Sequence, residues 1–199
     1  MRIVGGKFKG RALAAPGAAG GGAAHLRPTS DRVRESLFNL LAHGPYDDAP
    51  EGRRVLDLFA GTGALGLEAM SRGAARAVFV DDHGPSRALI RTNVETLGLM
   101  GDTKIWRRDA TRLGPNRGDP FDLIFLDPPY GKGLGAQALA SAKAGGWLAD
   151  SALIVMETAA DEAAPEEIAW VEDRTYGETR ILVFTASGAS PLGADDPAS

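Results

Sequence analysis

The sequence predicts an α/β fold in which a parallel sheet is covered by helices on both faces. Between residues 51 and 185, apolar runs typical of strands alternate with segments of helical periodicity, a pattern typical of parallel sheets. A glycine-rich loop, residues 61–66, separates the first expected strand from the first expected helix, as in nucleotide-binding α/β proteins. With 199 residues, the chain suits one such domain with a small appendage.

Residues 1–50 are expected to form this appendage, made of a hairpin, a loop and a helix. Residues 2–11 predict a short hairpin or arm with a turn at Gly5 and Gly6, and the glycine- and alanine-rich residues 14–24 predict a mobile loop. A helix is expected next, because apolar residues recur at helical spacing after residues that can cap it. The apolar residues are Val33, Leu37, Leu40 and Leu41, and the candidate caps are Thr29, Ser30 and Asp31. Turn-forming residues between 44 and 52 place the boundary between this appendage and the main domain near residue 50.

Strands and helices are expected to alternate through the main domain, residues 51–185. The expected strands are residues 55–59, 77–80, 104–106, 121–126, 152–156, 168–171 and 181–184. Helices are expected at residues 64–71, which Gly73 would close, and at residues 85–97. Residues 186–199 are expected to form a disordered tail.

The composition excludes several classes of chemistry. The chain has no cysteine, which excludes disulfides, thiolate metal sites and any cysteine nucleophile. Methylation of cytosine carbon 5 through a cysteine adduct and iron–sulfur radical chemistry are excluded for the same reason. His25, His43 and His83 do not have metal-ligand spacing, so we expect no metal. There is no run of eighteen apolar residues and no apolar signal segment, which predicts a cytoplasmic protein without a membrane span.

The charge is distributed unevenly along the chain. The net charge is −4, but residues 1–34 hold seven basic residues and one acid, whereas residues 150–199 hold eleven acids and two arginines. A basic end on an acidic body can dock a polyanion locally. The candidate RNA-binding residues are Lys7, Lys9, Arg11, Arg27 and Arg32. Alternatively, the basic terminus is only solvated, and Arg27 and Arg34 brace the helix against the core.

The segment Gly61-Thr62-Gly63-Ala64-Leu65-Gly66 fits the pattern G-x-G-x-x-G and predicts a site for a nucleotide-type cofactor. Glycines let the backbone turn tightly and approach a ligand, and the following helix offers free N–H groups. Asp81 ends the next expected strand about 20 residues later, where an acid can accept both ribose hydroxyls. The alternative is a glycine turn with a purely structural role.

Two further acids favour S-adenosylmethionine over a nicotinamide dinucleotide. Asp57 precedes the first glycine by four residues and can hold, directly or through water, an ammonium group that a dinucleotide lacks. Asp109 and Ala110 follow the third expected strand and can contact the adenine amine, although Asp109 can equally be a solvated loop acid. A dehydrogenase would also need a proton donor, and no histidine stands at a strand end.

Asp127-Pro128-Pro129-Tyr130 directly follows the expected strand 121–126. Asp127 and the Pro128 carbonyl can accept hydrogen bonds from an exocyclic amine of a nucleobase, while Tyr130 stacks on the base. By itself the tetrapeptide can equally be a proline-stiffened loop. However, Asp57, Asp81 and Asp109 also lie near the carboxyl ends of expected parallel strands, the edge where open α/β sheets bind ligands. The four acids together predict an amino-methyltransferase.

Residues 1–11 and 27–39 look like the N-terminal signatures of the RsmD-type methyltransferases, and residues 57–68 and 127–130 resemble their cofactor loop and catalytic tetrapeptide. That family methylates the exocyclic N2 of a guanine in 16S ribosomal RNA. The resemblance implies a Rossmann-like class I methyltransferase fold with seven strands, mostly parallel with the last antiparallel, and an N-terminal hairpin and helix. The implied cofactor-binding residues are Asp57, Phe59, Ala60, Gly61, Thr62, Gly63, Asp81, Asp109 and Ala110.

The resemblance also implies S-adenosylmethionine as cofactor and 16S ribosomal RNA as partner, within the small subunit or an assembly intermediate. Asp81 stands where the family pattern has glutamate, and Tyr130 where it usually has phenylalanine. The chemistry of the tetrapeptide suits an adenine N6 amine of DNA or RNA equally well, so the guanine assignment rests on the resemblance. A non-catalytic binding protein is a further alternative, and nothing in the sequence requires more than a monomer.

Overall fold

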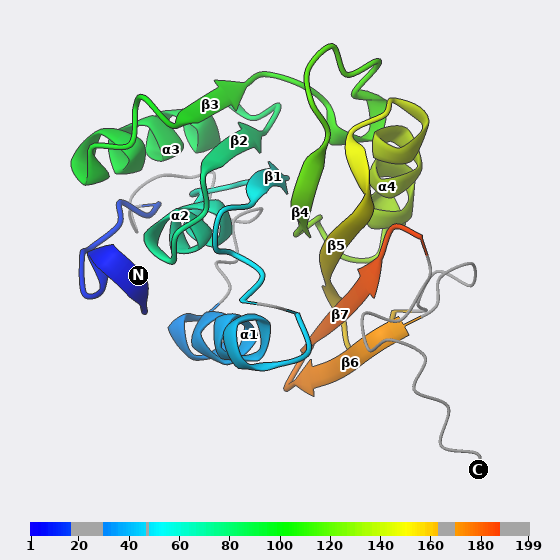
Figure 1. Cartoon of the computed structure of the whole chain (residues 1–199), viewed down its shortest axis with the longest axis horizontal. Helices are drawn as coiled ribbons and strands as arrows, with labels where there is room; N and C mark the ends of the chain where they lie inside the picture. The colour runs from blue at the N-terminus through cyan, green and yellow to red at the C-terminus, as the bar shows by residue number, and fades with distance from the viewer. Residues whose placement is uncertain (17–29, 47, 163–169, 188–199) are drawn as a thin grey trace.

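The computed structural model describes residues 1–16, 30–46, 48–162 and 170–187. Within these residues, one sheet contains seven strands in the spatial order β3-β2-β1-β4-β5-β7-β6 (Figure 1). The strands are β1 (Arg54–Leu58), β2 (Arg76–Val80), β3 (Thr103–Trp106), β4 (Phe121–Leu126), β5 (Leu148–Ala159), β6 (Trp170–Tyr176) and β7 (Thr179–Thr185).

The order of the strands reverses between β1 and β4. Strands β1 to β5 are parallel; the chain moves outwards from β1 through β2 to β3 and then returns to the other side of β1 as β4. Strand β7 is antiparallel to both of its neighbours, β5 and β6. The predicted fold class is confirmed, including the antiparallel last strand. In open α/β sheets, ligands bind beside such a reversal at the carboxyl ends of the strands.

Helices cover both faces of the sheet. Helices α1 (Asp31–His43), α2 (Ala64–Ser71) and α3 (Gly84–Leu97) share one hydrophobic cluster with one face, and α4 (Leu134–Ala144) and the 3₁₀ turn η3 (Ala110–Arg112) share another with the opposite face. Successive residues of a strand point to opposite faces, so Val55 of β1 joins the first cluster and Leu56 the second. Among the described residues, no helix is both long and apolar enough to cross a membrane.

The predicted bounds of α2 and β4 agree with the structure, and Ser30 caps α1 by accepting a hydrogen bond from the Val33 N–H at 3.2 Å. Helix α4 was not predicted. Its buried positions are Gly135, Ala138 and Ala142, which make no apolar stripe in the sequence. The expected strand 168–171 was also wrong in its bounds, because β6 continues to Tyr176 through charged residues that suit a sheet edge; residues 168 and 169 lie outside the described residues.

The first 14 residues form an arm, here called the N-terminal arm. Its two ends pair in antiparallel fashion, with hydrogen bonds from the Ile3 N–H to the Arg11 carbonyl and from the Leu13 N–H to the Met1 carbonyl. The 3₁₀ turn η1 (Gly6–Phe8) closes the arm, in place of the expected turn at Gly5 and Gly6. Of the expected mobile loop, residues 14–24, residues 17–24 lie outside the described residues. The same holds for residues 188–199 of the expected tail.

Gly5 and Gly6 are needed because the N-terminal arm lies directly against the end of α2. A Cβ on Gly5 would stand 2.2 Å from a guanidinium nitrogen of Arg72, and one on Gly6 would stand 1.9 Å from the Ser71 carbonyl oxygen. Gly6 also has a φ of 71°, a conformation that glycine adopts readily. The Ser71 hydroxyl donates to the Gly5 carbonyl at 2.6 Å and accepts from the Phe8 N–H at 2.9 Å. The arm is thus fixed to α2 by contacts that exclude a side chain.

A buried ionic network joins the N-terminal arm, α1 and α2. Arg34 and Glu68 are both fully buried, with the Arg34 Nε 3.7 Å from the Glu68 Oε2. Glu68 also accepts hydrogen bonds from the Val4 N–H at 2.8 Å and from the Arg72 Nε at 2.9 Å. Arg34 donates to the Arg2 carbonyl and, at 2.8 Å, to the carboxylate of Asp31. Arg34 therefore braces the helix, as one of the two sequence interpretations proposed.

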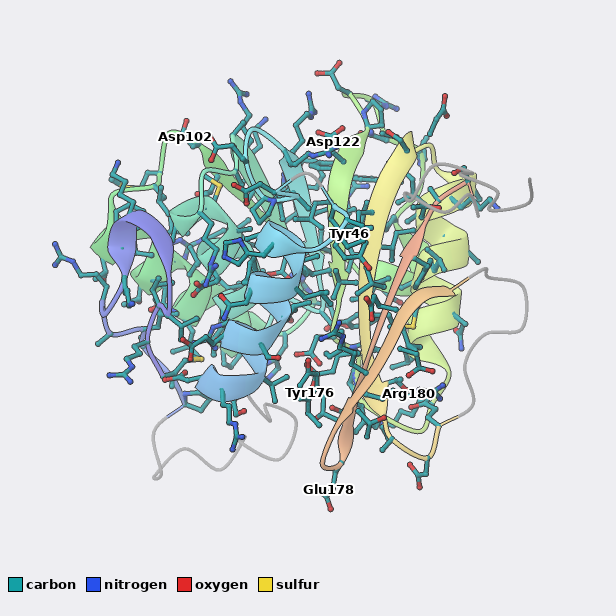
Figure 2. All side chains as sticks on the ribbon, turned by 60° about the horizontal axis from the view of Figure 1, so that its bottom comes forward. Tyr46, Asp102, Asp122, Tyr176, Glu178 and Arg180 are labelled. Atoms are coloured by element: carbon teal, nitrogen blue, oxygen red, sulfur yellow. The ribbon has the colours of Figure 1, made fainter. Side chains whose placement is uncertain are left out.

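The hairpin of β6 and β7 lies beside α1. Figure 2 shows Tyr176 next to this helix and Glu178 at the tip of the hairpin. The Tyr176 hydroxyl and the Ser36 hydroxyl of α1 are 2.8 Å apart, within hydrogen-bond distance. This contact ties the edge of the sheet to α1, the helix within residues 1–50.

Candidate functional site

The loops that follow β1, β2 and β4 meet at one edge of the sheet. Leu58, the last residue of β1, is in register with Val80 of β2 and Leu126 of β4. Backbone hydrogen bonds continue past the strand ends, from the Ala60 N–H to the Val80 carbonyl at 3.2 Å and from the Asp127 N–H to the Leu58 carbonyl at 3.4 Å. The glycine loop and the tetrapeptide 127–130 therefore lie next to each other, on either side of the strand reversal.

The loop between β1 and α2 has an unusual backbone. Gly61 and Gly63 have φ values of 57° and 77°, and Phe59 has a φ of 58°, in the left-handed region that a bulky side chain rarely adopts. Such strain persists where the surroundings impose it, and it clusters at functional sites. Gly63 is also the N-cap of α2, so this loop delivers the free N–H groups of a helix N-terminus to the edge. Thr62 is buried within the loop.

Asp57 supports this loop from inside the protein. Its side chain is 1% exposed, and its Oδ2 accepts a hydrogen bond from the Gly66 N–H in the first turn of α2 at 2.9 Å. A Cβ on Gly66 would stand 2.5 Å from the Phe79 ring and 3.0 Å from this oxygen, so only glycine allows the helix to pack this closely. Burial raises the pKa of Asp57 to about 8, against the lowering effect of the Gly66 N–H, and the nearby Asp81 raises it further.

The replacement Asp57→Asn is expected to remove a pH dependence of stability. Because the folded pKa of Asp57 is about 8 and its ordinary value is 3.8, the folded protein holds a proton here that the unfolded chain releases. This group therefore lowers the free energy of unfolding as the pH rises from about 4 to about 8, by up to about 1.4 kcal/mol per pH unit. Asparagine keeps the acceptor for Gly66 but does not titrate. Urea unfolding of both proteins across this range should give diverging stabilities; parallel curves would contradict the assignment.

Asp81 connects two loops at the edge. Its Oδ2 accepts from the Gly61 N–H at 2.9 Å, and its Oδ1 accepts from the His83 N–H at 2.8 Å at the start of α3. Burial raises the pKa of Asp81 above its ordinary value, and these two N–H groups oppose the rise. Asp81 is thus held against the glycine loop, a contact that the sequence spacing did not predict.

Asp109 has a more local environment. It is exposed and caps η3, accepting from the Thr111 N–H at 2.8 Å and the Thr111 hydroxyl at 2.7 Å. The Thr111 hydroxyl lowers the pKa of Asp109, and Arg112 adds to this effect. The neighbouring Ala110 is buried in the hydrophobic cluster against which Trp106 packs. Asp109 therefore fixes the loop after β3 as an ionised carboxylate.

The tetrapeptide 127–130 is anchored at its aromatic end. The Tyr130 hydroxyl donates to the Glu157 Oε1 of β5 at 2.6 Å and lies 3.3 Å from the Thr179 Oγ1 of β7. Burial and the Glu157 carboxylate raise the pKa of Tyr130, so the phenol stays protonated. The next residue, Gly131, donates its N–H to Glu162 at 3.2 Å. Pro128 is buried, whereas Pro129 is exposed.

The replacement Tyr130→Phe is expected to lower the free energy of unfolding by about 1–3 kcal/mol, because Glu157 is 5% exposed and would lose a hydrogen-bond donor. Phenylalanine keeps the ring, so the loss reports the hydroxyl alone. Urea unfolding of Tyr130→Phe, Glu157→Gln and the double variant measures the coupling between the two side chains. Additive effects of the two replacements would contradict a direct interaction.

Four of the five candidate RNA-binding residues lie on the N-terminal arm and α1, and Arg27 lies outside the described residues. Lys7 stands over the Phe8 ring, with its Nζ 5.2 Å from the ring centroid. Lys9 and Arg32 line one pocket of about 400 Å³, and Arg11 is exposed. The arm also reaches the candidate site, because Asn93 bonds to both backbone groups of Ala14 and donates to the Thr62 carbonyl at 3.0 Å.

Comparison with known proteins identifies the family. A family model described as "Conserved hypothetical protein 95" matches residues 1–185. The Escherichia coli protein named Ribosomal RNA small subunit methyltransferase D is 41% identical over 166 residues, which are 83% of this chain and 78% of that protein. The chain belongs to the RsmD family. A Haemophilus influenzae protein of the same name is 35% identical over 182 residues, or 89% of each chain.

Solved structures agree with this RsmD family assignment. The Escherichia coli protein yhhF superposes with a TM-score of 0.76 at 34% identity, covering 93% of this chain and 97% of that chain. A Thermus thermophilus 16S rRNA N2 methyltransferase, RsmC, superposes with a TM-score of 0.63 at 23% identity, covering 81% of this chain and 46% of that chain. The similarity to RsmC shows that the two proteins share a fold. The resemblance inferred from the sequence is confirmed at the level of the RsmD family.

Several residues of this RsmD family member that shape the candidate edge were not predicted from the sequence. They are Glu157, Glu162, Thr179 and Asn93, and also Gly66, whose close contact with Phe79 and Asp57 was not predicted. Glu157 carried one signal, since it is a charged residue at the end of an expected apolar strand. The other residues act through contacts between segments far apart in the chain, and such contacts leave no local pattern.

Proposed function

We propose that this chain transfers a methyl group from S-adenosylmethionine to the exocyclic N2 amine of a guanine in 16S ribosomal RNA. The observation that carries the proposal is the meeting of the glycine loop and the tetrapeptide 127–130 at one edge, in a member of the RsmD family. The RNA is proposed to be presented by the small subunit or an assembly intermediate, and the protein to act as a monomer.

The loop after β1 and the acids around it fit such a cofactor. Gly61 and Gly63 leave the backbone open to close approach, and the α2 N-terminus presents free N–H groups. The Asp81 carboxylate is proposed to accept from the ribose hydroxyls, Asp57 to face the ammonium group directly or through water, and Asp109 with Ala110 to contact the adenine. Phe59, Ala60 and Thr62 complete the proposed binding loop. When bound, the cofactor supplies a methyl group already activated by a sulfonium charge.

The tetrapeptide is proposed to act on the amine. The lone pair of an exocyclic amine is delocalised into the base, so the amine is a poor nucleophile until it is oriented. Asp127 and the Pro128 carbonyl accept hydrogen bonds from its two N–H groups and hold the lone pair towards the methyl group. Pro129 restricts the backbone conformation of the tetrapeptide. The Tyr130 ring stacks on the flipped base, a contact worth on the order of 1–3 kcal/mol. Formation of the new N–C bond would break the bond between sulfur and the methyl group and release a neutral thioether, and the proton that the amine loses would pass to the Asp127 carboxylate.

Residues 1–50 are proposed as the extension that contacts RNA. Lys7, Lys9, Arg11 and Arg32 lie on the N-terminal arm and α1, and together with Arg27 they are proposed to bind phosphates. Hydrogen bonds of the arm through Asn93 to Thr62 support a link between this surface and the cofactor loop. The residues after 50 carry the proposed methyltransferase core.

Incubation with labelled S-adenosylmethionine and undermethylated small subunits tests the proposal. Digestion of the RNA and separation of its nucleosides should place the label in N2-methylguanosine. Label in N6-methyladenosine would instead support the adenine alternative, and unlabelled RNA would refute methyl transfer to this substrate. Subunits that already carry the modification serve as the matched control, because they should accept no label.

A further inference from the structure

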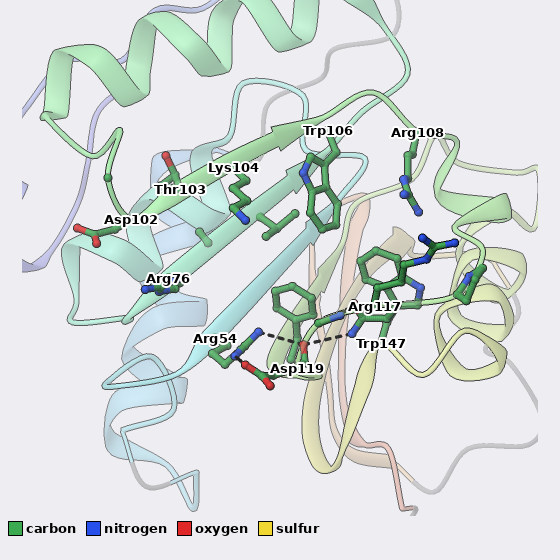
Figure 3. A pocket seen from close by; sticks show the side chains of 17 residues that line it. Arg54, Arg76, Asp102, Thr103, Lys104, Trp106, Arg108, Arg117, Asp119 and Trp147 are labelled. Atoms are coloured by element: carbon green, nitrogen blue, oxygen red, sulfur yellow. Dashed lines mark hydrogen bonds and ion pairs between the residues drawn. The ribbon is translucent and has the colours of Figure 1, made fainter.

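A second concave surface extends from the amino ends of β1 to β4 along β3 to its carboxyl end. It is a pocket of about 570 Å³, here called the basic groove, and Figure 3 shows it from close by. Its lining includes Arg54, Arg76, Thr103 and Phe121, which are the first residues of β1, β2, β3 and β4. β4 has six residues, so its first residue, Phe121, stands about 20 Å along the strand from Asp127, whereas Trp106 and Arg108 extend the lining to the carboxyl end of β3.

The basic groove exists because part of one sheet face carries no helix within the described residues. The connection from β3 to β4 contains only the short turn η3 and a loop, and α4 packs nearer to η3 and β5. Alternation along β3 places Lys104 and Trp106 on the same face, and Figure 3 shows both side chains directed to the groove. This part of the sheet is therefore open to a ligand.

The aromatic wall of the groove is rigid. The Trp106 and Trp147 rings meet edge to face at 5.5 Å, and Trp147 stacks on Phe121 at 6.1 Å. Trp147 is buried and its Nε1 donates to the Gly114 carbonyl at 2.7 Å. Trp106 is the half-buried member of this cluster, so its ring is the most accessible of the three, and the Arg108 guanidinium stands 5.5 Å from its centroid.

The charges of the groove favour an anion. Its lining holds five cations and two acids, although the chain as a whole carries a net charge of −4. Arg54 is paired with Asp119, and Arg108 donates to the Leu113 carbonyl. The remaining cations, Arg76, Lys104 and Arg117, are exposed and form no ion pair among the described residues. Such cations beside an aromatic ring match the phosphates and bases of a single strand.

We propose that the basic groove binds a single-stranded segment of the RNA substrate, distinct from the nucleotide that is methylated. The phosphates lie against Arg76, Lys104 and Arg117, and one base contacts Trp106. This inference rests on the proposed function for the identity of the RNA. It adds a contact on the face opposite α2 and α3, which runs along β3 from the amino ends of the strands to Trp106.

The test compares two double charge reversals. Arg76→Glu with Lys104→Glu changes the groove, and Arg91→Glu with Lys143→Glu makes the same change of charge at exposed positions outside it. Binding to the small subunit and to an oligouridine of roughly a dozen nucleotides is measured over a range of salt concentrations. For single strands, each lost phosphate contact reduces the slope of log affinity against log salt concentration by about 0.7. The slope of the groove variant should therefore be smaller by about 1.4, and its affinity should be about tenfold or more below that of the control.

Equal affinities and slopes of the two double variants would overturn the groove proposal. Binding of polyglutamate to the wild-type groove as tightly as oligouridine would also overturn it, because the surface would then serve acidic proteins. Methyl transfer by the wild-type protein is measured in parallel. Absence of methyl transfer would refute the proposed function alone. Normal methyl transfer, combined with equal affinities and salt slopes of the two double variants, would refute the groove proposal alone.

Discussion

Replacement of Asp127 by alanine is expected to lower the rate of methyl transfer on the order of 10²–10³-fold, comparable to the removal of one positioned hydrogen-bond partner in other active sites. Asp127 follows β4 directly, and its N–H is bonded to Leu58 of the neighbouring strand, so its position is set by the sheet. Without its carboxylate, the amine keeps only the Pro128 carbonyl as acceptor. Single-turnover rates with undermethylated small subunits measure the effect.

The replacement Asp127→Asn separates orientation from charge. Asparagine retains a carbonyl acceptor, so it should recover part of the rate if the main role is to hold the amine. Affinity for S-adenosylmethionine, measured by calorimetry, should change little in either variant, because Gly61 and Asp81 belong to the other side of the strand reversal. Near wild-type turnover of Asp127→Ala would refute the role of the tetrapeptide.

The replacement Glu68→Ala is expected to lower the free energy of unfolding by about 3–5 kcal/mol, because it removes one partner from a buried ionic network. Glu68 is fully buried and satisfies Arg34, Arg72 and the Val4 N–H at once. For a chain of this size, a loss of this magnitude lowers the melting temperature by on the order of 10 °C. Thermal unfolding followed by circular dichroism measures it.

Two controls define the origin of this loss. Glu68→Gln keeps a hydrogen-bond acceptor and the shape of the side chain without the charge. Its melting temperature should lie between those of the wild type and Glu68→Ala. Glu35→Ala removes an exposed acid from α1 and should change stability by less than about 0.5 kcal/mol. If Glu68→Ala unfolds at the same temperature as Glu35→Ala, the network contributes nothing to stability.

The parts of the fold that have local causes could be predicted from the sequence. Strand β4 is an apolar run interrupted only by Asp122, α2 follows a glycine loop, and both have the predicted bounds. Helix α4 could not be predicted, since its buried face consists of alanine and glycine, residues with no apolar periodicity. The charged residues of β6 concealed a strand whose partner lies later in the chain.

The candidate site divides in the same way. The spacing of the strand-end acids predicted that Asp57, Asp81, Asp109 and Asp127 would gather at one edge, because parallel strands bring their carboxyl ends together. The hydrogen bonds of the Asp109 side chain are local, to Thr111 of η3. The spacing did not reveal that Asp57 and Asp81 hold backbone N–H groups of the glycine loop. It also gave no sign of the basic groove, whose cations come from segments between residues 54 and 117. Such contacts follow from the tertiary structure alone.

The N-terminal arm has a consequence for synthesis of the chain on the ribosome. Its hydrogen bonds go from Val4 to Glu68, from Phe8 to Ser71 and from Ala14 to Asn93, partners 63 to 79 residues later in the chain. At 5–20 residues per second, these partners are made roughly 3–16 s after the arm itself. The residues made first thus wait for the segment that follows the glycine loop before they take their final shape. A nascent chain that stops short of residue 93 would carry its basic residues without the surface that arranges them.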